Sequence, residues 1–143
     1  MTTFISGHMS HARLLHFSVW TAQLVLASFF GAMAVLKLMP QFDRVVELMA
    51  WAGSVPETFV RMLGVVELLG AIAVAAPAVT HLPQRVVGYT AVFFLTLMSA
   101  ATIIHIARGE PRMLIINLSV GALAAFVAWG RLAHKPLEVE ESI

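Results

Sequence analysis

Residues 56–77 read PETFVRMLGVVELLGAIAVAAP, and this stretch decides the fold. It is long enough to cross a bilayer, since roughly 20 apolar residues span the hydrocarbon core as a helix. Besides Glu57 at its start, it holds a second acid, Glu67, in its middle. A carboxylate near the bilayer centre costs roughly 2.5–3.5 kcal/mol on insertion scales, so it faces protein or a water-filled cavity and finds a partner. The stretch therefore predicts a transmembrane helix with a polar contact inside the protein.

The composition of the whole chain is that of a membrane protein. Of its 143 residues, 59% are hydrophobic and 12% are charged, whereas soluble domains average about 45–50% apolar and about 25% charged residues. The net charge is +1 and no basic stripe is present, which excludes a nucleic-acid surface. Because the chain has no cysteine, disulfides, thiol catalysis and thiolate metal sites are excluded as well.

Hydrophobic runs predict an all-α, integral membrane bundle of four transmembrane helices in a single domain over residues 1–143. The spans are expected at about residues 17–39, 57–77, 85–107 and 112–131. Only helices satisfy their own backbone groups in lipid without closing into a barrel. Residues 40–56 mix charges with an apolar face, so we expect a short interfacial amphipathic helix there, with Trp51 at headgroup depth.

The two ends of the chain are polar. We expect residues 1–16 to form a short arm before the first helix and the acidic tail, residues 134–143, to be disordered. Four spans place both termini on the same side of the membrane. Lys and Arg are nearly balanced between the two sides, so the positive-inside rule does not decide the orientation. The interpretation adopted is a bacterial inner (cytoplasmic) membrane with both termini in the cytoplasm.

Each predicted helix carries at least one polar residue. We predict that these residues line an intramembrane ligand-binding pocket: Gln23, Lys37, Glu67, His105 and Asn117. All except Gln23 lie at mid-span or towards the side where Lys37 emerges. Simpler roles are open for each of them: Lys37 can snorkel to the headgroups, Glu67 can form a structural hydrogen bond, and His105 can serve as a helix-end group. Gln23 and Asn117 can act as links between helices.

The same residues allow the possible kinds of chemical site in the bundle to be compared. A di-metal carboxylate site needs Glu-x-x-His motifs on two helices and two further acids, but the predicted spans contain a single glutamate in mid-membrane. A haem held by His16 and His105 is excluded, because both rings would have to lie at one depth and the two histidines lie at opposite sides of the membrane. A nucleophile set of Ser99, His105 and Glu67 lacks any elbow or oxyanion motif. We therefore predict no catalytic residue and no metal, and a lipid-soluble ligand such as a quinone or a lipid.

Short motifs in each helix carry a family resemblance. They are Gln23, Gly31 and Lys37-Leu38, then Leu63-Gly64 and Glu67-Leu68-Leu69-Gly70-Ala71, then Met98-Ser99-Ala100 with His105, and finally Asn117 with Gly130-Arg131. Through these motifs, over about residues 17–131, the chain resembles the DoxX-like family of small four-helix membrane proteins. The resemblance implies a membrane bundle. Members of that family include the small membrane subunit associated with thiosulfate:quinone oxidoreduction and proteins linked to oxidative-stress responses, so the resemblance also implies partner redox subunits.

Two functions remain open from the sequence. The first is a quinone- or lipid-binding subunit of a membrane redox complex, in which Lys37 and Glu67 form a buried pair and His105 assists proton exchange. The alternative is a non-enzymatic membrane scaffold or assembly factor without a bound cofactor, and assembly into a homo-oligomer fits either function. A transporter is disfavoured because no inverted repeat or broken helix is present.

Overall fold

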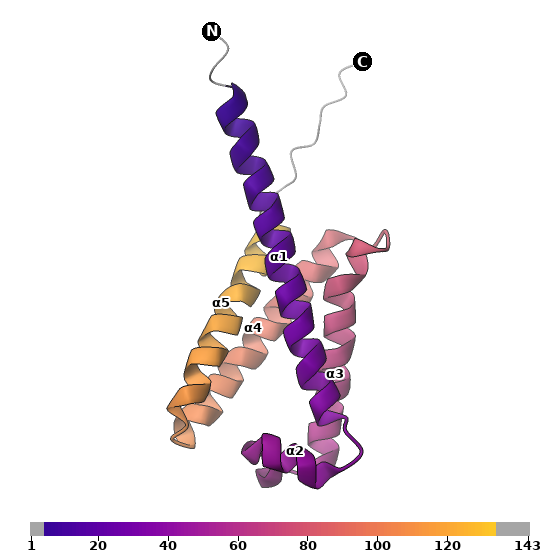
Figure 1. Cartoon of the computed structure of the whole chain (residues 1–143), viewed down its shortest axis with the longest axis vertical. Helices are drawn as coiled ribbons and strands as arrows, with labels where there is room; N and C mark the ends of the chain where they lie inside the picture. The colour runs from indigo at the N-terminus through magenta and orange to yellow at the C-terminus, as the bar shows by residue number, and fades with distance from the viewer. Residues whose placement is uncertain (1–4, 134–143) are drawn as a thin grey trace.

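The computed structural model describes residues 5–133, and the tail predicted to be disordered lies outside them. Its elements in chain order are α1 (Ile5–Lys37), α2 (Phe42–Leu48), the 3-10 helix η1 (Ala50–Ser54), α3 (Glu57–Ala75), the 3-10 turn η2 (Ala76–Ala78), α4 (Gln84–Ala107) and α5 (Pro111–Leu132) (Figure 1). Within this range there is no strand. Four segments are long and apolar enough to cross a membrane: Arg13–Lys37, Glu57–Ala78, Gln84–Ala107 and Pro111–Leu132. The predicted all-α membrane bundle, with its short interfacial helix, is confirmed.

The first helix is longer than the sequence analysis expected. α1 contains 33 residues and starts at Ile5, so most of the predicted N-terminal arm is helical. The arm lacked an apolar stripe and was therefore assigned no structure. A helix that is already nucleated adds one hydrogen bond for each further residue it orders, and no proline interrupts residues 5–16. The transmembrane part of α1 thus nucleates its own extension.

Glycine and proline set the ends of the later helices. Pro77 lies in η2, and Pro83 precedes the first residue of α4. Gly109 adopts a φ of 69° in the turn after α4, a left-handed conformation that suits glycine. Pro111 then starts α5 at a position where its missing N–H has no consequence. These breaks fold α5 back against α4.

The long helices form two antiparallel hairpins, α1 with α3 and α4 with α5 (Figure 1). α1 starts and α5 finishes at the same end of the bundle, which we call the terminal end. The opposite end, called the loop end, carries α2 and the turn at Gly109. The hairpins approach each other towards the terminal end and diverge towards the loop end (Figure 1). The loop-end halves of the hairpins are therefore held together less closely than the terminal halves.

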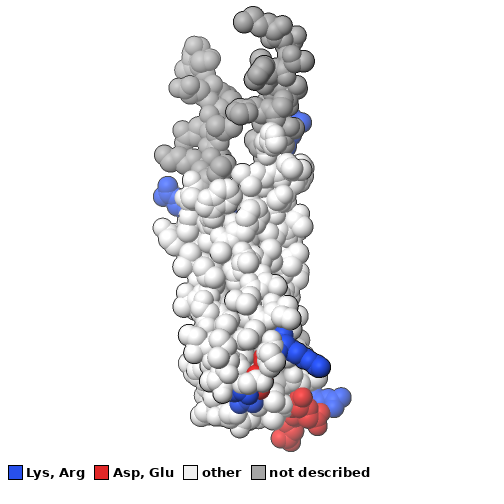
Figure 2. All heavy atoms as spheres, turned by 90° about the vertical axis from the view of Figure 1, so that its left-hand side faces the viewer, with Lys and Arg blue, Asp and Glu red and all other residues white. Residues whose placement is uncertain are grey.

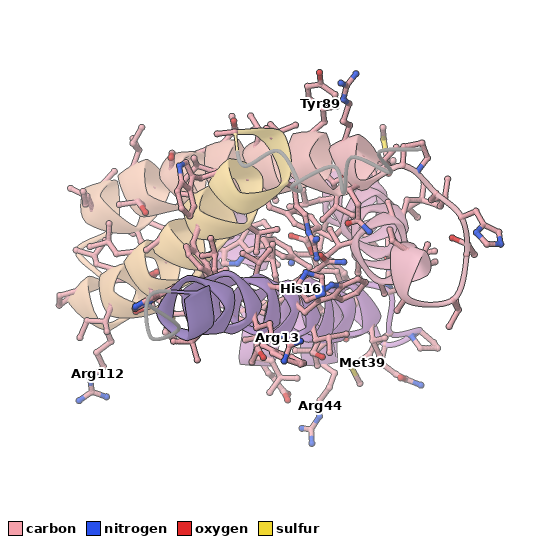
Figure 3. All side chains as sticks on the ribbon, turned by 90° about the horizontal axis from the view of Figure 1, so that it is seen from above. Arg13, His16, Met39, Arg44, Tyr89 and Arg112 are labelled. Carbon is pink, nitrogen blue, oxygen red and sulfur yellow. The ribbon has the colours of Figure 1, made fainter. Side chains whose placement is uncertain are left out.

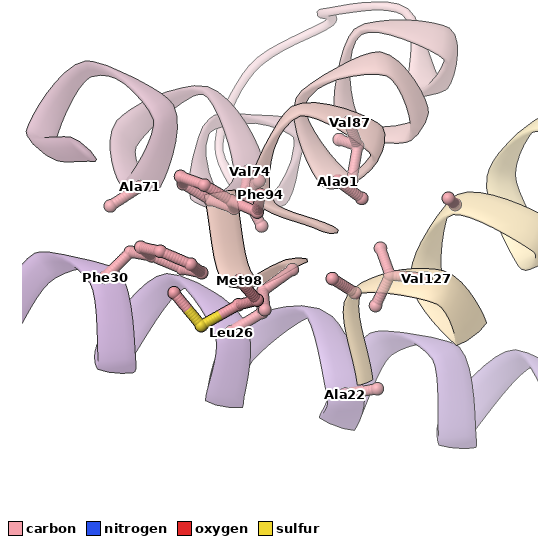
Figure 4. Close-up of a cluster of buried hydrophobic side chains, with 12 residues drawn as sticks. Ala22, Leu26, Phe30, Ala71, Val74, Val87, Ala91, Phe94, Met98 and Val127 are labelled. Atoms are coloured by element: carbon pink, nitrogen blue, oxygen red, sulfur yellow. The ribbon is translucent and has the colours of Figure 1, made fainter. Parts of the chain in front are cut away.

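Buried residues recur at heptad spacing along each long helix. In α3 the buried positions are Val60, Gly64, Glu67, Ala71 and Val74. Corresponding stripes on the other helices meet in one apolar cluster, shown in Figure 4. At its centre the rings of Phe30 and Phe94 stack with centroids 3.6 Å apart and planes 6° apart. A second, smaller cluster of Val45, Ala52 and Val60 holds α2 and η1 against α3. We call the larger cluster, around Phe30 and Phe94, the apolar midsection and the smaller cluster at the loop end the apolar floor.

The outer surface matches a lipid environment. Large apolar side chains are exposed on every long helix, for example Leu24, Leu69, Ile103 and Leu118. On the face in Figure 2 an uncharged band separates the charged side chains at the two ends. Seen from the terminal end, Tyr89, Arg44 and Arg112 project outwards from the bundle (Figure 3). The charged groups on this surface thus lie at the ends of the helices and leave the middle for acyl chains.

Candidate functional site

The buried polar side chains of the described residues are the five that the sequence singled out. Their exposed fractions are 0% for Gln23, 4% for Lys37, 3% for Glu67, 9% for His105 and 7% for Asn117. Each lies on the buried stripe of its helix, where a polar group is costly unless it has a partner. The structure does not join all five in one set of contacts. It divides them into an ion pair, a cluster at the α4–α5 turn, a single amide and a group at the terminal end.

Lys37 and Glu67 form an ion pair between α1 and α3. Lys37 Nζ donates to Glu67 Oε2 at 2.7 Å. The two backbones approach closely here, because a Cβ added to Gly64 would lie 2.9 Å from the Cβ of Lys37. The Trp51 ring of η1 has its centroid 5.9 Å from Lys37 Nζ. Since Lys37 is buried beneath this ring and paired, it does not snorkel to the surface.

Arg61 fixes the end of α1 that carries the lysine. Its guanidinium donates to the backbone oxygen of Lys37 at 2.8 Å and also to that of Met39. Glu57, one turn earlier on α3, accepts from Arg61 at 2.9 and 3.1 Å. Carbonyls at a helix C-terminus have no partner within the helix, and a cation there satisfies them. The sequence does not single out Arg61, because the backbone oxygens that it binds are 24 and 22 positions away.

A second polar cluster ties the α4–α5 turn to η1. His105 Nδ1 lies 2.6 Å from Glu110 Oε2, and Arg108 Nε donates to Glu110 Oε1 at 2.8 Å. Arg108 also donates to Ser54 Oγ at 3.0 Å. Hydrogen bonds from Arg108 first, and then from His105, hold the pKa of Glu110 below its ordinary value of 4.5. His105 was predicted as a site residue from the sequence, whereas Glu110 and Arg108 were not.

Asn117 is buried, and its side chain holds a hydrogen-bond donor, Nδ2, that has no partner among the described residues. Across the α4–α5 hairpin, a Cβ on Gly121 would meet the side chain of Met98 at 3.6 Å. Asn117 lies one turn nearer to the α4–α5 turn on the same stripe of α5. A buried amide N–H without an acceptor costs about 1–3 kcal/mol, so this position can accept a hydrogen-bonding ligand at low cost.

Gln23 belongs to the other end of the bundle, so the expectation that it shares a pocket with the other four residues is not met by its contacts. Its Nε2 donates to the backbone oxygen of Val74 at 2.6 Å. Its Oε1 accepts from Arg131 Nε at 2.9 Å and from Arg131 Nη2 at 2.6 Å. The geometric reason is the length of α1, because Gln23 and Lys37 share a face but are four turns apart.

The interior of the loop-end half differs from the apolar midsection. Between the midsection and the floor, the buried positions of the long helices are small or polar: Ala34, Lys37, Gly64, Glu67, His105 and Asn117. Two of the polar groups belong to the α1–α3 hairpin and two to the α4–α5 hairpin. Within the described residues, no group of three or more metal-ligating side chains comes together. The arrangement offers hydrogen-bond donors from both hairpins.

Comparison with known proteins gives a family. No match is found among the curated proteins or among the solved structures. The sequence pattern of the DoxX-like family matches residues 21–127, which is most of the chain and includes all five buried polar residues. Four apolar helices of membrane-spanning length accompany that match. The chain therefore belongs to the DoxX-like family and is an integral membrane protein.

Proposed function

We propose that this protein is a quinone-binding integral subunit of a membrane redox complex, with the ligand held in the loop-end half between the two hairpins. The observation that carries the proposal is the ion pair of Lys37 and Glu67, 2.7 Å long and nearly excluded from solvent. An ionisable residue inside a membrane segment points to a functional site by default. The proposal identifies the ligand by the chemistry of the donors around this pair.

The pair is a poor device for stability alone. Removing two charges from water costs several kcal/mol each, and well-packed apolar residues of similar size are often as stable or more stable. The apolar midsection shows that this chain can pack the same heptad positions with leucine and phenylalanine, as at Leu26 and Phe30. We therefore assign the pair to ligand binding.

A quinone ring suits the donors of this region. It carries two carbonyl oxygens that accept hydrogen bonds and an apolar ring and tail that enter from lipid. The Lys37 ammonium donates to one carbonyl and Asn117 Nδ2, which has no partner in the described chain, donates to the other. Glu67 compensates the lysine charge in both the empty and the occupied bundle. The absence of a side chain at Gly64 lets α1 and α3 approach closely where they hold the ion pair.

The turn cluster provides the proton route. Reduction of a quinone to a quinol takes up two electrons and two protons. The electrons come from a partner redox subunit, since the chain itself has no cysteine for thiol chemistry. The protons pass from the surface through Glu110, with a side chain 30% exposed, to His105, with a side chain 11% exposed. This role uses the 2.6 Å contact between the two groups.

The experiment is an isothermal calorimetric titration of the detergent-solubilised protein with decylubiquinone. Glu67→Gln keeps the shape and one acceptor but removes the charge, so affinity should fall about tenfold or more, equivalent to about 1.4 kcal/mol. Glu47→Gln is the matched control, because Glu47 is also in an ion pair at the loop end, with Arg44, but its side chain is 62% exposed. Its affinity should equal that of wild type. Equal affinities for both variants, or no binding by wild type, would refute the proposal and leave the scaffold function.

Asn117→Leu separates binding from stability. Because Nδ2 has no partner in the described chain, removing the amide should leave thermal stability unchanged or raise it. Affinity for decylubiquinone should nevertheless fall, because one of the two carbonyls loses its donor. A variant that is destabilised and still binds the quinone as wild type does would show that Asn117 is a structural amide.

A further inference from the structure

The two ends of the bundle differ in charge. The acidic side chains of the described residues are all at the loop end or on the mid-part of α3: Asp43, Glu47, Glu57, Glu67 and Glu110. The terminal end carries Arg13, Arg85 and Arg131 and, within residues 5–133, no aspartate or glutamate. On the face in Figure 2, acidic side chains appear only near the end that holds α2. The described part of the terminal end is therefore an unneutralised cationic surface.

Arg131 differs from the other two arginines because its guanidinium is held in place. Nε and Nη2 both donate to Gln23 Oε1, at 2.9 and 2.6 Å. The guanidinium carbon lies 4.7 Å from the centroid of the Trp20 ring. Gln23 is itself completely buried and is anchored to the backbone oxygen of Val74 at 2.6 Å. One amide thus links α1, α3 and α5 and fixes the plane of the arginine fork.

These contacts orient the arginine without neutralising it. The amide oxygen of Gln23 is uncharged, and it accepts from two of the five N–H groups of the guanidinium. No described carboxylate pairs with Arg131 in the structure. A half-buried cation at the edge of an apolar bundle is stabilised by an anion that meets its remaining donors. The group held by Gln23 and Trp20 is therefore a preformed half of an anion site.

The depth of the residue indicates which anion fills the site. Arg131 is the second-last residue of the membrane segment Pro111–Leu132, so it lies where the hydrocarbon core gives way to headgroups. Tryptophan is enriched at that depth, and basic sites between helices there bind lipid headgroups. A phosphate presents paired oxygens that match the arginine fork. We propose that Arg131, with Trp20 as its platform, binds the phosphate of an anionic phospholipid at the terminal end.

This site is separate from the proposed quinone site. Its residues lie beyond the apolar midsection, at the opposite end of the bundle from Lys37 and Glu67. Bound lipid would hold the last turn of α5 against the middle of α1, because Arg131 and Trp20 come from these two segments. Its failure or success leaves the quinone proposal unchanged.

The test compares the thermal unfolding midpoint of wild type, Arg131→Gln and Arg85→Gln in uncharged detergent. Arg85 is the matched control because it is exposed at the same end. Added phosphatidylglycerol should raise the midpoint of wild type and Arg85→Gln but not that of Arg131→Gln, while phosphatidylcholine has a smaller effect. The proposal is overturned if all three proteins respond alike, if phosphatidylcholine is as effective, or if inorganic phosphate reproduces the full shift.

Two further variants keep the test decisive. Arg131→Lys retains the charge and the fold but loses the fork, so native mass spectrometry should detect fewer bound phosphatidylglycerol molecules than in wild type. Equal occupancy in Arg131→Lys and wild type would refute a phosphate site built on the fork. The sequence also offers Glu138, Glu140 and Glu141 as internal anions. If phosphatidylglycerol leaves the unfolding midpoint of wild type unchanged but raises that of a variant with all three glutamates changed to glutamine, the chain's own tail occupies the site in wild type. The lipid proposal is then wrong.

Discussion

Replacing Lys37 and Glu67 singly and then together tests how the buried ion pair contributes to stability. Lys37→Met leaves the Glu67 carboxylate buried without its partner, and Glu67→Leu leaves the ammonium in the same state. Both side chains are at most 5% exposed, so water cannot compensate for the loss. Removal of one partner from a buried pair costs about 3–5 kcal/mol. Each single variant should lose about that much of its free energy of unfolding.

The double variant Lys37→Met/Glu67→Leu should recover most of the loss. Two apolar side chains replace two charges, and such replacements range from neutral to about 1–4 kcal/mol stabilising. The double-mutant cycle should thus yield a large coupling energy between the two positions. Unfolding by sodium dodecyl sulfate in mixed micelles, followed by circular dichroism, measures all four proteins.

An exposed pair of the same length supplies the control. Arg44 and Glu47 also lie 2.7 Å apart, but their side chains are 65% and 62% exposed. Arg44→Met or Glu47→Leu should cost less than about 1 kcal/mol, because exposed pairs contribute little. Single variants of the buried pair that are as mild as these controls would refute the reasoning, as would a double variant as unstable as the singles.

Two other perturbations test the packing and the turn. Gly70→Ala should destabilise the bundle by about 1–3 kcal/mol, since the new Cβ would lie 2.6 Å from Phe94 Cζ, whereas Gly31→Ala meets its nearest neighbour at 3.9 Å and should be neutral in the same unfolding assay. The pKa of Glu110 is lowered in the folded state by Arg108 and His105, so its stabilising effect is complete above its ordinary value of 4.5 and is lost as the pH falls through the lower folded-state pKa. Melting curves between pH 6 and pH 3 should show this loss in wild type and a weaker one in Glu110→Gln; identical curves would contradict the assignment.

The fold and the buried polar residues follow from local features of the sequence. The spans depend on hydrophobic run length, and the polar residues at heptad positions had to face the interior because lipid excludes them. The pairing of Lys37 with Glu67 was anticipated as part of the quinone hypothesis, and the structure contains it. The binding role of these residues is still a prediction.

The remaining contacts depend on how one helix is rotated and shifted against another. Arg131 reaches Gln23 across 108 positions of the chain, and Arg108 reaches Ser54 across 54. Charged residues near helix ends are usually solvated, so nothing local distinguishes these from their neighbours. The position of Gln23 in the first span already places it towards the other side of the membrane from Lys37, but its contacts with Val74 and Arg131 depend on how the helices are shifted against one another.

The stacked Phe30 and Phe94 rings lie in the apolar midsection, between the buried polar groups of the loop end and those of the terminal end. The buried side chains around them are apolar, including Leu26, Val74 and Met98, and carry no polar group that could bind water or an ion. If the loop end binds a quinone as proposed, we expect the protons taken up there to come from the aqueous phase at that end. Redox turnover there would then exchange protons with a single aqueous compartment.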